Sequence, residues 1–369
     1  STVTATTGEP AVGVAMTLVL REATDADRAD WGAFVASRPE ADVLQAWPWG
    51  EAGNDEPGEH WSRLLVADGG GHIRGVAQVL TRSTSFGRTV QYVPHGPLWD
   101  RQGTDAAEVL ARLLTGLKTH ARERRCIVLK LDPRGSGNSA GDTAVERIFA
   151  SAGEPAAHDL QAPTTRIIDL QAGDDPVAGW GKDARAEARR AEREGTTVTV
   201  DRDGDPDVLD AFHELLTATA ERQGFRIRTR DFLSRLAAPM AASGDWFLAL
   251  AEHDGTPLAG AIAPRTGDRA FYLYAASTRD KELARKRGPY AAMAELQRAL
   301  RETGTATLDL WGVREPDDET VDPAWEGFSV FKRRFGGVPL RHPGTFDLVI
   351  DPTWSRIRDW RERLRGLGR

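Results

Sequence analysis

The stretch WFLALAEHDGTPLAGAIAP at residues 246–264 decides the fold, because the chain repeats its pattern elsewhere. Alternating apolar residues lie on both sides of the HDG sequence at 253–255. The earlier stretch RLLVADGGGHIRGVAQVL at residues 63–80 shows the same alternation around three glycines at 69–71. Alternating apolar residues around a glycine-centred turn are typical of a β-hairpin. We therefore predict one such hairpin in each half of the chain.

The elements that follow each hairpin repeat as well. In the first half, a strand-like run at 89–100 precedes a helical pattern and then the run CIVLKLDPRG at 126–135. In the second half, the corresponding runs lie at 269–280 and 306–313, again with a helical pattern between them. This order of three strands, a loop, a helix and a strand is that of the acyl-CoA N-acetyltransferase (GNAT) fold. Since a repeated unit usually means one fold used twice, we expect an α/β (α+β) protein with two tandem GNAT-like domains.

The domain boundaries are predicted from this duplication. We expect residues 1–16 to form a flexible leader and residues 161–340 to form the second domain. Residues 17–160, together with 341–369 and their C-terminal helix, should form the first domain. A chain of 369 residues is long enough for two domains. Nothing heptad-like interrupts residues 212–250, so no coiled-coil insertion is expected.

Composition excludes several classes of protein. Hydrophobic residues make up 40% and charged residues 28%, which is typical of a globular chain, and no apolar run reaches the ~20 residues of a membrane span. The single cysteine, Cys126, excludes an internal disulfide, indicates a cytoplasmic location and lies in an apolar run, which favours a buried thiol over a nucleophile. The eight histidines are scattered without metal-ligand spacing, so no metal site is expected. A formal charge of −7 argues against a general nucleic-acid coat protein but allows a local basic face.

Two basic segments stand out near the end of the second half. In FSVFKRRFGGVPL at 328–340, three cations lie between Phe331 and Phe335, which raises the question of what negative group they meet. In DKELARKRGPYAAM at 280–293, cations precede a helix start, where backbone N–H groups bind anions. This segment fits the first half of the acetyltransferase pyrophosphate pattern, but Tyr290 occupies its last small-residue position and should crowd a pyrophosphate. An exposed basic turn is the alternative interpretation.

A third basic segment is GWGKDARAEARRAEREG at 179–195. Lys182, Arg185, Arg189 and Arg193 fall on one stripe of the predicted helix, which ends at Gly195. One interpretation is a stripe that follows RNA phosphates. The other is a solvated helix laced with salt bridges.

Taken in order, several motifs carry a family resemblance. They are VLQAWPWGE, YVPHGPLWD, KDARAEARRAEREG, TATAERQGF, YLYAAST, GPYAAMAELQRALRETG, LDLWGV and FSVFKRRFGG. Together they resemble the Fem family of peptidoglycan-bridge aminoacyltransferases over about residues 40–347. The resemblance implies two GNAT-like domains, without the coiled-coil insertion of some members. It also implies transfer of an amino acid from aminoacyl-tRNA to an amine of a peptidoglycan precursor, either lipid II or a UDP-linked muropeptide, with no cofactor beyond the aminoacyl-tRNA co-substrate.

The resemblance also implies catalytic roles. The lysine of the Phe-Lys-x-x-Phe-Gly-Gly motif, here Lys332, is expected beside the reacting ester, where its ammonium would stabilise the tetrahedral oxyanion. Phe331 and Phe335 would anchor the segment. Asp100 matches a carboxylate proposed to help the attacking amine lose its proton, and a plain turn aspartate is the alternative.

Other residues are expected to bind the substrates. Arg222 and Arg228 should meet the diphosphate of the acceptor. The remaining substrate-binding residues implied by the motifs are Gln45, Trp49, Phe331, Tyr274 and Tyr290. The residues expected to bind tRNA are Lys182, Arg185, Arg189, Arg193, Arg285, Lys286, Arg287, Arg333 and Arg334.

The chain also departs from the Fem pattern. Gly53 stands near the place where a lysine usually contacts the muropeptide phosphate, and His95 stands where arginine is common. These departures weaken the assignment of the acceptor more than that of the chemistry. A small-peptide or secondary-metabolite acceptor is therefore the second hypothesis. A coenzyme A-dependent N-acyltransferase, which Tyr290 disfavours, and an inactive RNA-binding relative are the others.

The last segment, SRIRDWRERLRGLGR at 355–369, has a basic amphipathic pattern with Ile357, Trp360 and Leu364 on one side. Docking on the first domain is one interpretation, and peripheral contact with an anionic membrane is the other. We expect a monomer.

Overall fold

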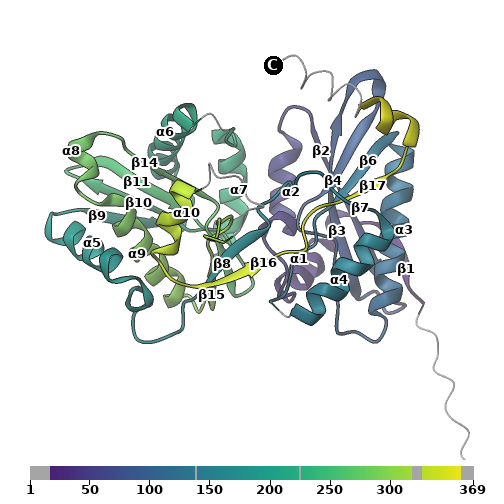
Figure 1. Ribbon diagram of the computed structural model, residues 1–369, viewed down its shortest axis with the longest axis horizontal. Helices are drawn as coiled ribbons and strands as arrows, with labels where there is room; N and C mark the ends of the chain where they lie inside the picture. The colour runs from purple at the N-terminus through teal and green to yellow at the C-terminus, as the bar shows by residue number, and fades with distance from the viewer. Residues whose placement is uncertain (1–16, 138, 224–225, 318–325, 359–369) are drawn as a thin grey trace, which may run out of the picture.

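The computed structural model describes residues 17–137, 139–223, 226–317 and 326–358, apart from the side chains at 139, 140, 222 and 223. Figure 1 shows two lobes that lie side by side, one for each half of the chain. The chain leaves the second lobe after β16 (Val338–Arg341) and re-enters the first as β17 (Phe346–Val349). In the described ranges, no helix is both long and apolar enough to cross a membrane.

An eight-stranded sheet forms the centre of the first lobe. Besides β17, its strands are β1 (Val19–Glu22), β2 (Glu59–Ala67), β3 (Ile73–Ser83), β4 (Thr89–Val93), β5 (Leu98–Trp99), β6 (Cys126–Leu131) and β7 (Glu154–Pro155). Their order is β1-β2-β3-β4-β6-β17-β7, with β5 paired to β3. The β4–β6 pair is parallel, and the other pairs are antiparallel. The hairpin predicted at 63–80 is β2–β3.

Helices cover both faces of this sheet, because successive residues of a strand point to opposite sides. The helices are α1 (Arg28–Ala36), α2 (Trp47–Asn54), α3 (Ala106–Glu123) and α4 (Ser139–Ala152), with short 3-10 turns η1 (Asp25–Asp27), η2 (Val43–Gln45) and η3 (Ser85–Gly87). Leu64 and Val66 of β2 join the core under α3 and α4. Leu65, between them, joins the core of α1 and α2, which contains Trp31 and Trp47.

The second lobe contains two sheets. The four-stranded sheet has the order β14-β11-β10-β9. Its strands are β9 (Thr197–Asp201), β10 (Leu248–His253), β11 (Thr256–Ile262) and β14 (Tyr274–Ser277). The five-stranded sheet has the order β12-β13-β15-β8-β16. Its other strands are β8 (Thr164–Asp169), β12 (Arg265–Thr266), β13 (Arg269–Phe271) and β15 (Thr307–Asp309). The hairpin predicted at 246–264 is β10–β11.

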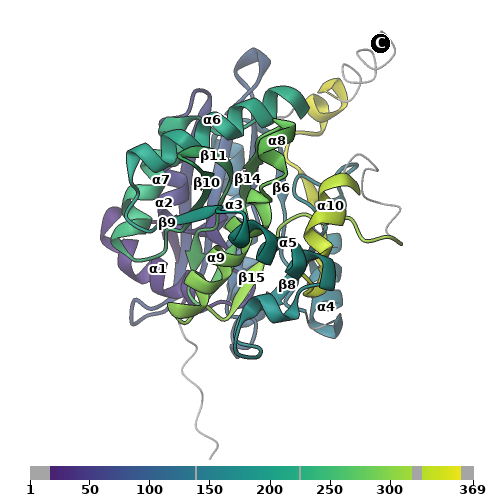
Figure 2. The same cartoon turned by 90° about the vertical axis from the view of Figure 1, so that its left-hand side faces the viewer.

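The helices of the second lobe surround these sheets. They are η4 (Pro176–Gly179), α5 (Lys182–Arg193), α6 (Pro206–Gln223), α7 (Arg230–Ala242), α8 (Lys281–Ala284), α9 (Gly288–Glu302) and α10 (Glu326–Arg333). Figure 2 shows α5 and α9 on one side of the lobe and α6 and α7 on the other. Helix α9 follows its strand as α3 does in the first lobe, which confirms the predicted repeat.

The run of chain at 269–277 belongs to both sheets of the second lobe. Its first part, β13, pairs in parallel with β15, while its second part, β14, pairs antiparallel with β11. Tyr272 and Leu273 lie between the two parts, where the chain leaves one sheet for the other. A strand that changes sheets opens a space beside it, and the main cavity of this lobe lies there.

The two lobes share an apolar core as well as a chain connection. Trp49 of α2 and Trp61 of β2 join one cluster with Phe212 of α6 and Phe232 of α7. The Trp49 and Phe232 rings meet edge to face at 5.2 Å. An apolar interface of this kind holds two domains in a fixed orientation.

Two predicted segments fall on residues outside the described ranges. One is the leader at 1–16, and the other is most of the C-terminal helix, including Trp360 and Leu364. Residues 352–358 are helical.

Candidate active site around Lys332

The main cavity of the second lobe has a volume of about 870 Å³ and is lined by residues of α6, β11, the 272–277 run, α9 and α10. Its polar lining groups include the side chains of Lys332, Tyr272, Tyr274, Ser277 and Thr219. Among the described residues that line it, none is acidic. The cavity therefore offers hydroxyl groups and one cation in otherwise apolar surroundings.

Lys332 lies at the C-terminal end of α10 and faces this cavity. Its Nζ donates a hydrogen bond to the carbonyl oxygen of Gly312 at 2.9 Å. The ammonium also lies over the rings of Tyr272 and Phe328, 5.7 and 5.2 Å from their centroids, which favours a cation. Burial lowers the pKa of Lys332 to about 8, while the negative charge of Asp309 acts in the opposite direction. The charged form is therefore the main form at pH 7.

The phenylalanines around Lys332 explain why cations and aromatic rings alternate in this segment. Phe335 is 1% exposed and its ring lies 4.5 Å from that of Trp180. Phe331 packs edge to face on Phe335 at 4.7 Å and lines the cavity beside Lys332. One side of α10 is thus fixed in the core, while Lys332 projects from another side into the cavity.

The Gly-Gly pair after Phe335 lets the chain pass close to two other elements. Gly336 and Gly337 both have a positive φ, +80° and +78°, which side chains rarely adopt. A Cβ atom on Gly336 would lie 2.9 Å from the Gly179 carbonyl, and one on Gly337 would lie 2.8 Å from the Ile167 carbonyl. These glycines therefore fix where α10 ends and where β16 begins.

A buried network of charges lies behind the cavity, between the two lobes. Arg134, which follows β6, donates to Asp42 of the first lobe at 2.8 Å and to Asp309 at the end of β15. Asp42 also pairs with His95. Each of these four side chains is at most 5% exposed. Because a buried charge is costly without a partner, this network holds the lobes in one arrangement.

The chain is similar to acetyltransferase domains and to aminoacyltransferases that act on peptidoglycan precursors. Residues 180–320 match the family model described as "Acetyltransferase (GNAT) domain". The UDP-N-acetylmuramoylpentapeptide-lysine N(6)-alanyltransferase of Weissella viridescens is 26% identical over 86% of this chain and 92% of that protein. The lipid II:glycine glycyltransferase of Staphylococcus epidermidis is 26% identical over 90% of this chain and 94% of that protein. The crystal structure of FemX superposes with a TM-score of 0.77 at 21% identity, covering 92% of this chain and 99% of that one.

This chain resembles Fem enzymes over most of its length, in sequence and in fold. A tandem GNAT protein from the clavulanic acid biosynthesis pathway shares the fold, with a TM-score of 0.53 at 13% identity over 91% of this chain and 99% of that one. The prediction of two tandem GNAT-like domains is confirmed. The limits of the two domains stay a prediction.

In the Fem-like chain, Asp100 lies away from the Lys332 cavity. It pairs with Arg38 at 2.8 Å and accepts a hydrogen bond from the Gln102 backbone N–H at 3.2 Å. Although burial opposes them, the Gln102 hydrogen bond and Arg38 hold the pKa of Asp100 below its usual range. The Arg38 carbonyl accepts from Arg269 at the start of β13, whereas Lys332 lies over Tyr272 beyond the end of that strand. This placement favours the turn-aspartate alternative over a base at the reacting amine.

Two residues predicted to contact the acceptor, Gln45 and Trp49, are buried in the core instead. Gln45 is fully buried, and its amide accepts from the Gln78 N–H at 2.8 Å and donates to the Pro94 carbonyl at 2.6 Å. Trp49 is 5% exposed and packs in the core between the lobes. The prediction that these side chains contact the acceptor is corrected here, because neither presents a free face to a ligand.

The cation expected to meet the acceptor diphosphate is already paired. Arg228 donates to both carboxylate oxygens of Glu59 at 3.0 Å and lies over the ring of Phe232. Although burial opposes them, Arg228 and Arg82 hold the pKa of Glu59 below its usual range. The side chain of the other predicted cation, Arg222, lies outside the described residues. Tyr274 lines the cavity, where burial raises its pKa to about 12 against the effect of Arg228.

Gly53, the departure from the Fem pattern, is closed to any side chain. A Cβ atom there would lie 2.2 Å from Nε1 of Trp61, closer than real contacts allow. The Trp61 indole in turn donates to Glu59 at 3.1 Å. Near the place where the family pattern has a lysine, this chain therefore has an indole and a carboxylate.

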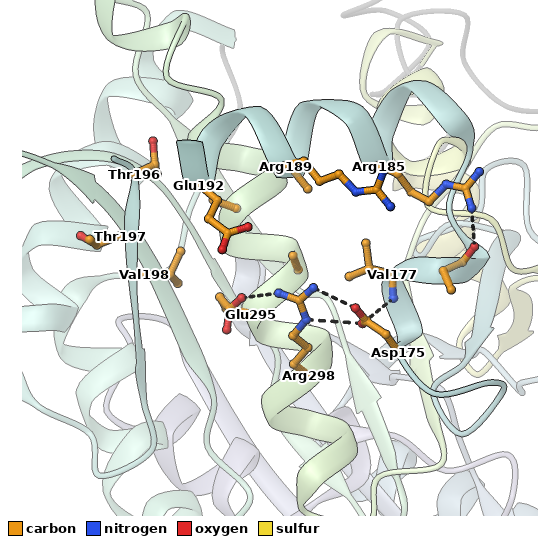
Figure 3. Close-up of a pocket in the computed structure, with 14 residues that line it drawn as sticks. Asp175, Val177, Arg185, Arg189, Glu192, Thr196, Thr197, Val198, Glu295 and Arg298 are labelled. Carbon is orange, nitrogen blue, oxygen red and sulfur yellow. Dashed lines mark hydrogen bonds and ion pairs between the residues drawn. The ribbon is translucent and has the colours of Figure 1, made fainter. Parts of the chain in front are cut away.

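The α5 stripe borders a second cavity of about 500 Å³ between α5 and α9. Figure 3 shows Arg185 and Arg189 extending from α5 along its edge. Arg185 donates to the Ala178 carbonyl at 3.1 Å, and Arg298 is held by Asp175 and Glu295. Three arginines and three carboxylates line this cavity, so its charges balance. The cavity itself is therefore not a basic site.

The other predicted tRNA contacts divide into paired and unpaired cations. Arg333 pairs with Glu326, Arg287 with Glu187 and Arg285 with Glu282. Arg334 donates to the hydroxyl of Tyr290 at 2.6 Å, and the Tyr290 ring packs on Phe331 at 5.4 Å. Among the predicted tRNA contacts, all of which lie in the described part of the chain, those without an ion pair or side-chain hydrogen bond are Lys182, Arg189, Arg193 and Lys286. Of these, Lys182, Arg189 and Arg193 are exposed along α5.

Sequence reasoning missed three residues around the cavity. Thr219 is 6% exposed, lines the cavity and has no hydrogen-bond partner for its hydroxyl. Asp309 and Arg134 link the first lobe to the turn that holds Lys332. A signal for Asp309 existed, because the apolar run ATLDLWGV contains a single charged residue at the end of a strand.

Proposed function

We propose that this Fem-like protein is an aminoacyltransferase that moves an amino acid from aminoacyl-tRNA to an amine of a peptidoglycan precursor. The observation that carries the proposal is the ammonium of Lys332, which lies over the rings of Tyr272 and Phe328 at the wall of a cavity whose described lining has no acidic group. The curated relatives support it, since they are an alanyltransferase and a glycyltransferase that act on such precursors. The proposed co-substrate is aminoacyl-tRNA, and no cofactor is needed.

The chemistry requires few groups. The acceptor amine attacks the ester carbonyl, a C–N bond forms, and the C–O bond to the tRNA breaks. The proton lost by the amine ends on the released ribose hydroxyl or in solvent. One N–H of Lys332 is held by Gly312, which leaves two for the oxyanion of the tetrahedral intermediate. Because the ester is already activated, no enzyme nucleophile is needed. Cys126 is no candidate, since burial raises its pKa to about 11.

A second acceptor class is favoured by one observation. Trp61 occupies the space beside Gly53, and Arg228 is held by Glu59, so the expected phosphate-binding cations are replaced or paired wherever their side chains are described. An acceptor without a phosphate at this position, such as a small peptide or a peptide-like metabolite, fits these surroundings better. The amide-forming chemistry at Lys332 is the same for both classes.

The test is a transfer assay with a mixture of radiolabelled aminoacyl-tRNAs and three acceptors, namely UDP-linked muropeptide, lipid II and a short peptide. Transfer that is lost after ribonuclease treatment supports the proposal and identifies both donor and acceptor. Transfer that requires acyl-coenzyme A supports the N-acyltransferase hypothesis instead. Tight tRNA binding without transfer to any acceptor supports the non-catalytic relative.

The proposed tRNA surface is the exposed face of α5, where the unpaired cations Lys182, Arg189 and Arg193 are spaced about two turns and one turn apart. We expect the variant Lys182→Gln/Arg189→Gln/Arg193→Gln to bind tRNA more weakly. Its log Kd should depend less steeply on log salt, with the slope reduced by about 2, since each lost phosphate contact removes about 0.7–0.9. Filter binding at several salt concentrations measures this. Arg122→Gln, on the exposed face of α3 in the other lobe, is the matched control. An unchanged slope in the triple variant would contradict the proposed surface.

The proposed setting is the cytoplasm, where aminoacyl-tRNA is available, with the protein as a monomer. Peripheral contact with an anionic membrane surface through the helix that starts at residue 352 is part of this proposal where lipid II is the acceptor.

A further inference from the structure

Lys332 is held by a turn that the first lobe fixes. This turn, residues 309–313, follows β15 and carries the Gly312 carbonyl that accepts from Nζ of Lys332 at 2.9 Å. Trp311 in the middle of the turn has φ of +59°, a left-handed conformation that a bulky residue adopts only when its surroundings hold it there. The position of the carbonyl, and with it that of the ammonium, therefore depends on whatever holds Trp311.

Asp309 is the group that holds Trp311. Its Oδ1 accepts from the Trp311 backbone N–H at 2.7 Å and from the hydroxyl of Thr165. The same hydroxyl lies 2.8 Å from the Trp311 carbonyl. At 2% exposure, Asp309 lies where such bonds are not exchanged for bonds to water.

The other oxygen of Asp309 connects the turn to the first lobe. Oδ2 accepts from Arg134, whose second Nη group donates to Asp42 at 2.8 Å. Arg134 is buried, and its guanidinium lies 5.5 Å from the centroid of the Phe271 ring and 6.0 Å from that of Trp311. A continuous set of polar contacts thus runs from Asp42 in the first lobe to Lys332 in the second.

We propose that Asp309, held by Arg134, is the positioning residue of Lys332, which fixes its carbonyl partner and supplies the negative charge that keeps it an ammonium. The inference rests on the proposed function, since it explains how the cation that would stabilise the oxyanion is held in place. It also connects the first lobe to the Lys332 cavity through a series of buried contacts.

The charges around the two groups are consistent with this role. Asp309 is the one described residue whose charge raises the pKa of Lys332 against burial. Tyr272, over which the ammonium lies, has a pKa raised by burial and is neutral. The groups that face Asp309 and Arg134 from the first lobe and from the segment after β16 are Asp42, His95 and His342. Burial, Arg134 and His95 hold the pKa of His342 well below its usual range, so it is neutral there.

The test uses the full-length variant Asp309→Asn, which keeps the shape of the side chain and removes its charge. In single-turnover transfer between pH 6 and 9, the wild-type rate should fall as Lys332 loses its proton. We expect this fall to begin about one pH unit lower in Asp309→Asn, because the charge of Asp309 raises the pKa of Lys332. Nearby opposite charges typically shift a pKa by about 1–3 units. Asp347→Asn is the matched control, since Asp347 pairs with Lys130 in the first lobe and should leave the profile unchanged.

A second measurement does not depend on activity. Only the neutral amine of a lysine reacts with acetic anhydride, so the labelling of Lys332, read by mass spectrometry at pH 7, should rise about fivefold in Asp309→Asn if the pKa falls by one unit from about 8. The variant Thr165→Val separates geometry from charge, since it removes one hydrogen bond to Asp309 and no charge. It should lower the transfer rate several-fold without moving the pH profile.

Each outcome has one meaning. An unmoved profile with unchanged labelling, in a variant whose thermal unfolding shows that it is folded, overturns the inference. A shifted pH profile in Thr165→Val also overturns it, because this variant changes no charge and should not change the pKa of Lys332. Absence of transfer by the wild type would overturn the proposed function, and full transfer by a variant that lacks Lys332 would overturn the role of Lys332 in the reaction. In either case the labelling would still decide whether Asp309 controls the protonation of Lys332.

Discussion

Replacing Lys332 with methionine should lower the rate of amide formation by about 10²–10³-fold, the usual effect of removing one group that stabilises an oxyanion. Methionine keeps most of the length and packing of the lysine stem but cannot donate to an oxyanion. Single-turnover transfer with saturating aminoacyl-tRNA measures the effect without contributions from binding. Lys118→Met, on α3 of the first lobe, is the matched control. A loss below tenfold would show that Lys332 does not act on the reacting carbonyl.

The same variant should be more stable than the wild type. Burial lowers the pKa of Lys332 to about 8, below that of an unfolded lysine, so at pH 7 the folded protein keeps a charge that it holds unfavourably. Removing it should raise the free energy of unfolding by about 1–3 kcal/mol at pH 7. Between the folded and unfolded pKa values the unfolded chain binds more protons, so the wild type gains stability as pH rises through this window. Lys332→Met should lack that gain, which urea unfolding at pH 7 and pH 9.5 would measure.

Replacing Arg134 with methionine should destabilise the protein by about 3–5 kcal/mol. The change leaves the carboxylates of Asp42 and Asp309 buried without their shared cation. Asp42 would then lose a charge that lowers its pKa, so burial would favour its protonated form in the folded state. The stability of the variant should therefore be lost as pH rises, so the deficit measured by urea unfolding should be smaller at pH 5 than at pH 8.

Arg82→Met is the control for this experiment. Arg82 also pairs with a carboxylate, that of Glu59, but its side chain is 60% exposed. Exposed pairs of this kind contribute about 0–1 kcal/mol, so the control should remain close to the wild type. Two results would contradict this prediction. One is an equal loss of stability in both variants, and the other is a loss in Arg134→Met that grows as pH falls. Either would mean that losing Arg134 does not leave buried carboxylates without a partner.

The order of elements could be read from the sequence because it depends on local patterns. Alternating residues around glycine turns predicted both hairpins, and helical spacing predicted α3 and α9. Lys332 is singled out by the resemblance of its motif, in which the phenylalanines that anchor α10 and the glycines that end it are neighbours in sequence. Local patterns of this kind survive in a single sequence, since they do not depend on distant partners.

The partners of individual side chains could not be predicted. Arg228 had the appearance of a free cation in a basic run, but Glu59, 169 residues earlier, pairs with it. Trp49 matched an acceptor-binding motif, but α7 brings Phe232 against it and buries it between the lobes. Such contacts depend on how two lobes dock, and docking leaves no periodicity in the sequence. Asp309 was missed for the same reason, because its partner Arg134 lies in the other lobe.

The indole of Trp61 beside Gly53 has a consequence for anyone who wishes to redirect this protein to a new acceptor. Introducing lysine at position 53 alone would force its Cβ into the indole, and shortening Trp61 alone would leave a void and remove the N–H that donates to Glu59. Each single substitution should give a protein that is less stable than its parent, so the two residues must be replaced together. Libraries that vary one residue at a time will therefore not introduce a lysine at position 53, whereas libraries that vary positions 53 and 61 together can.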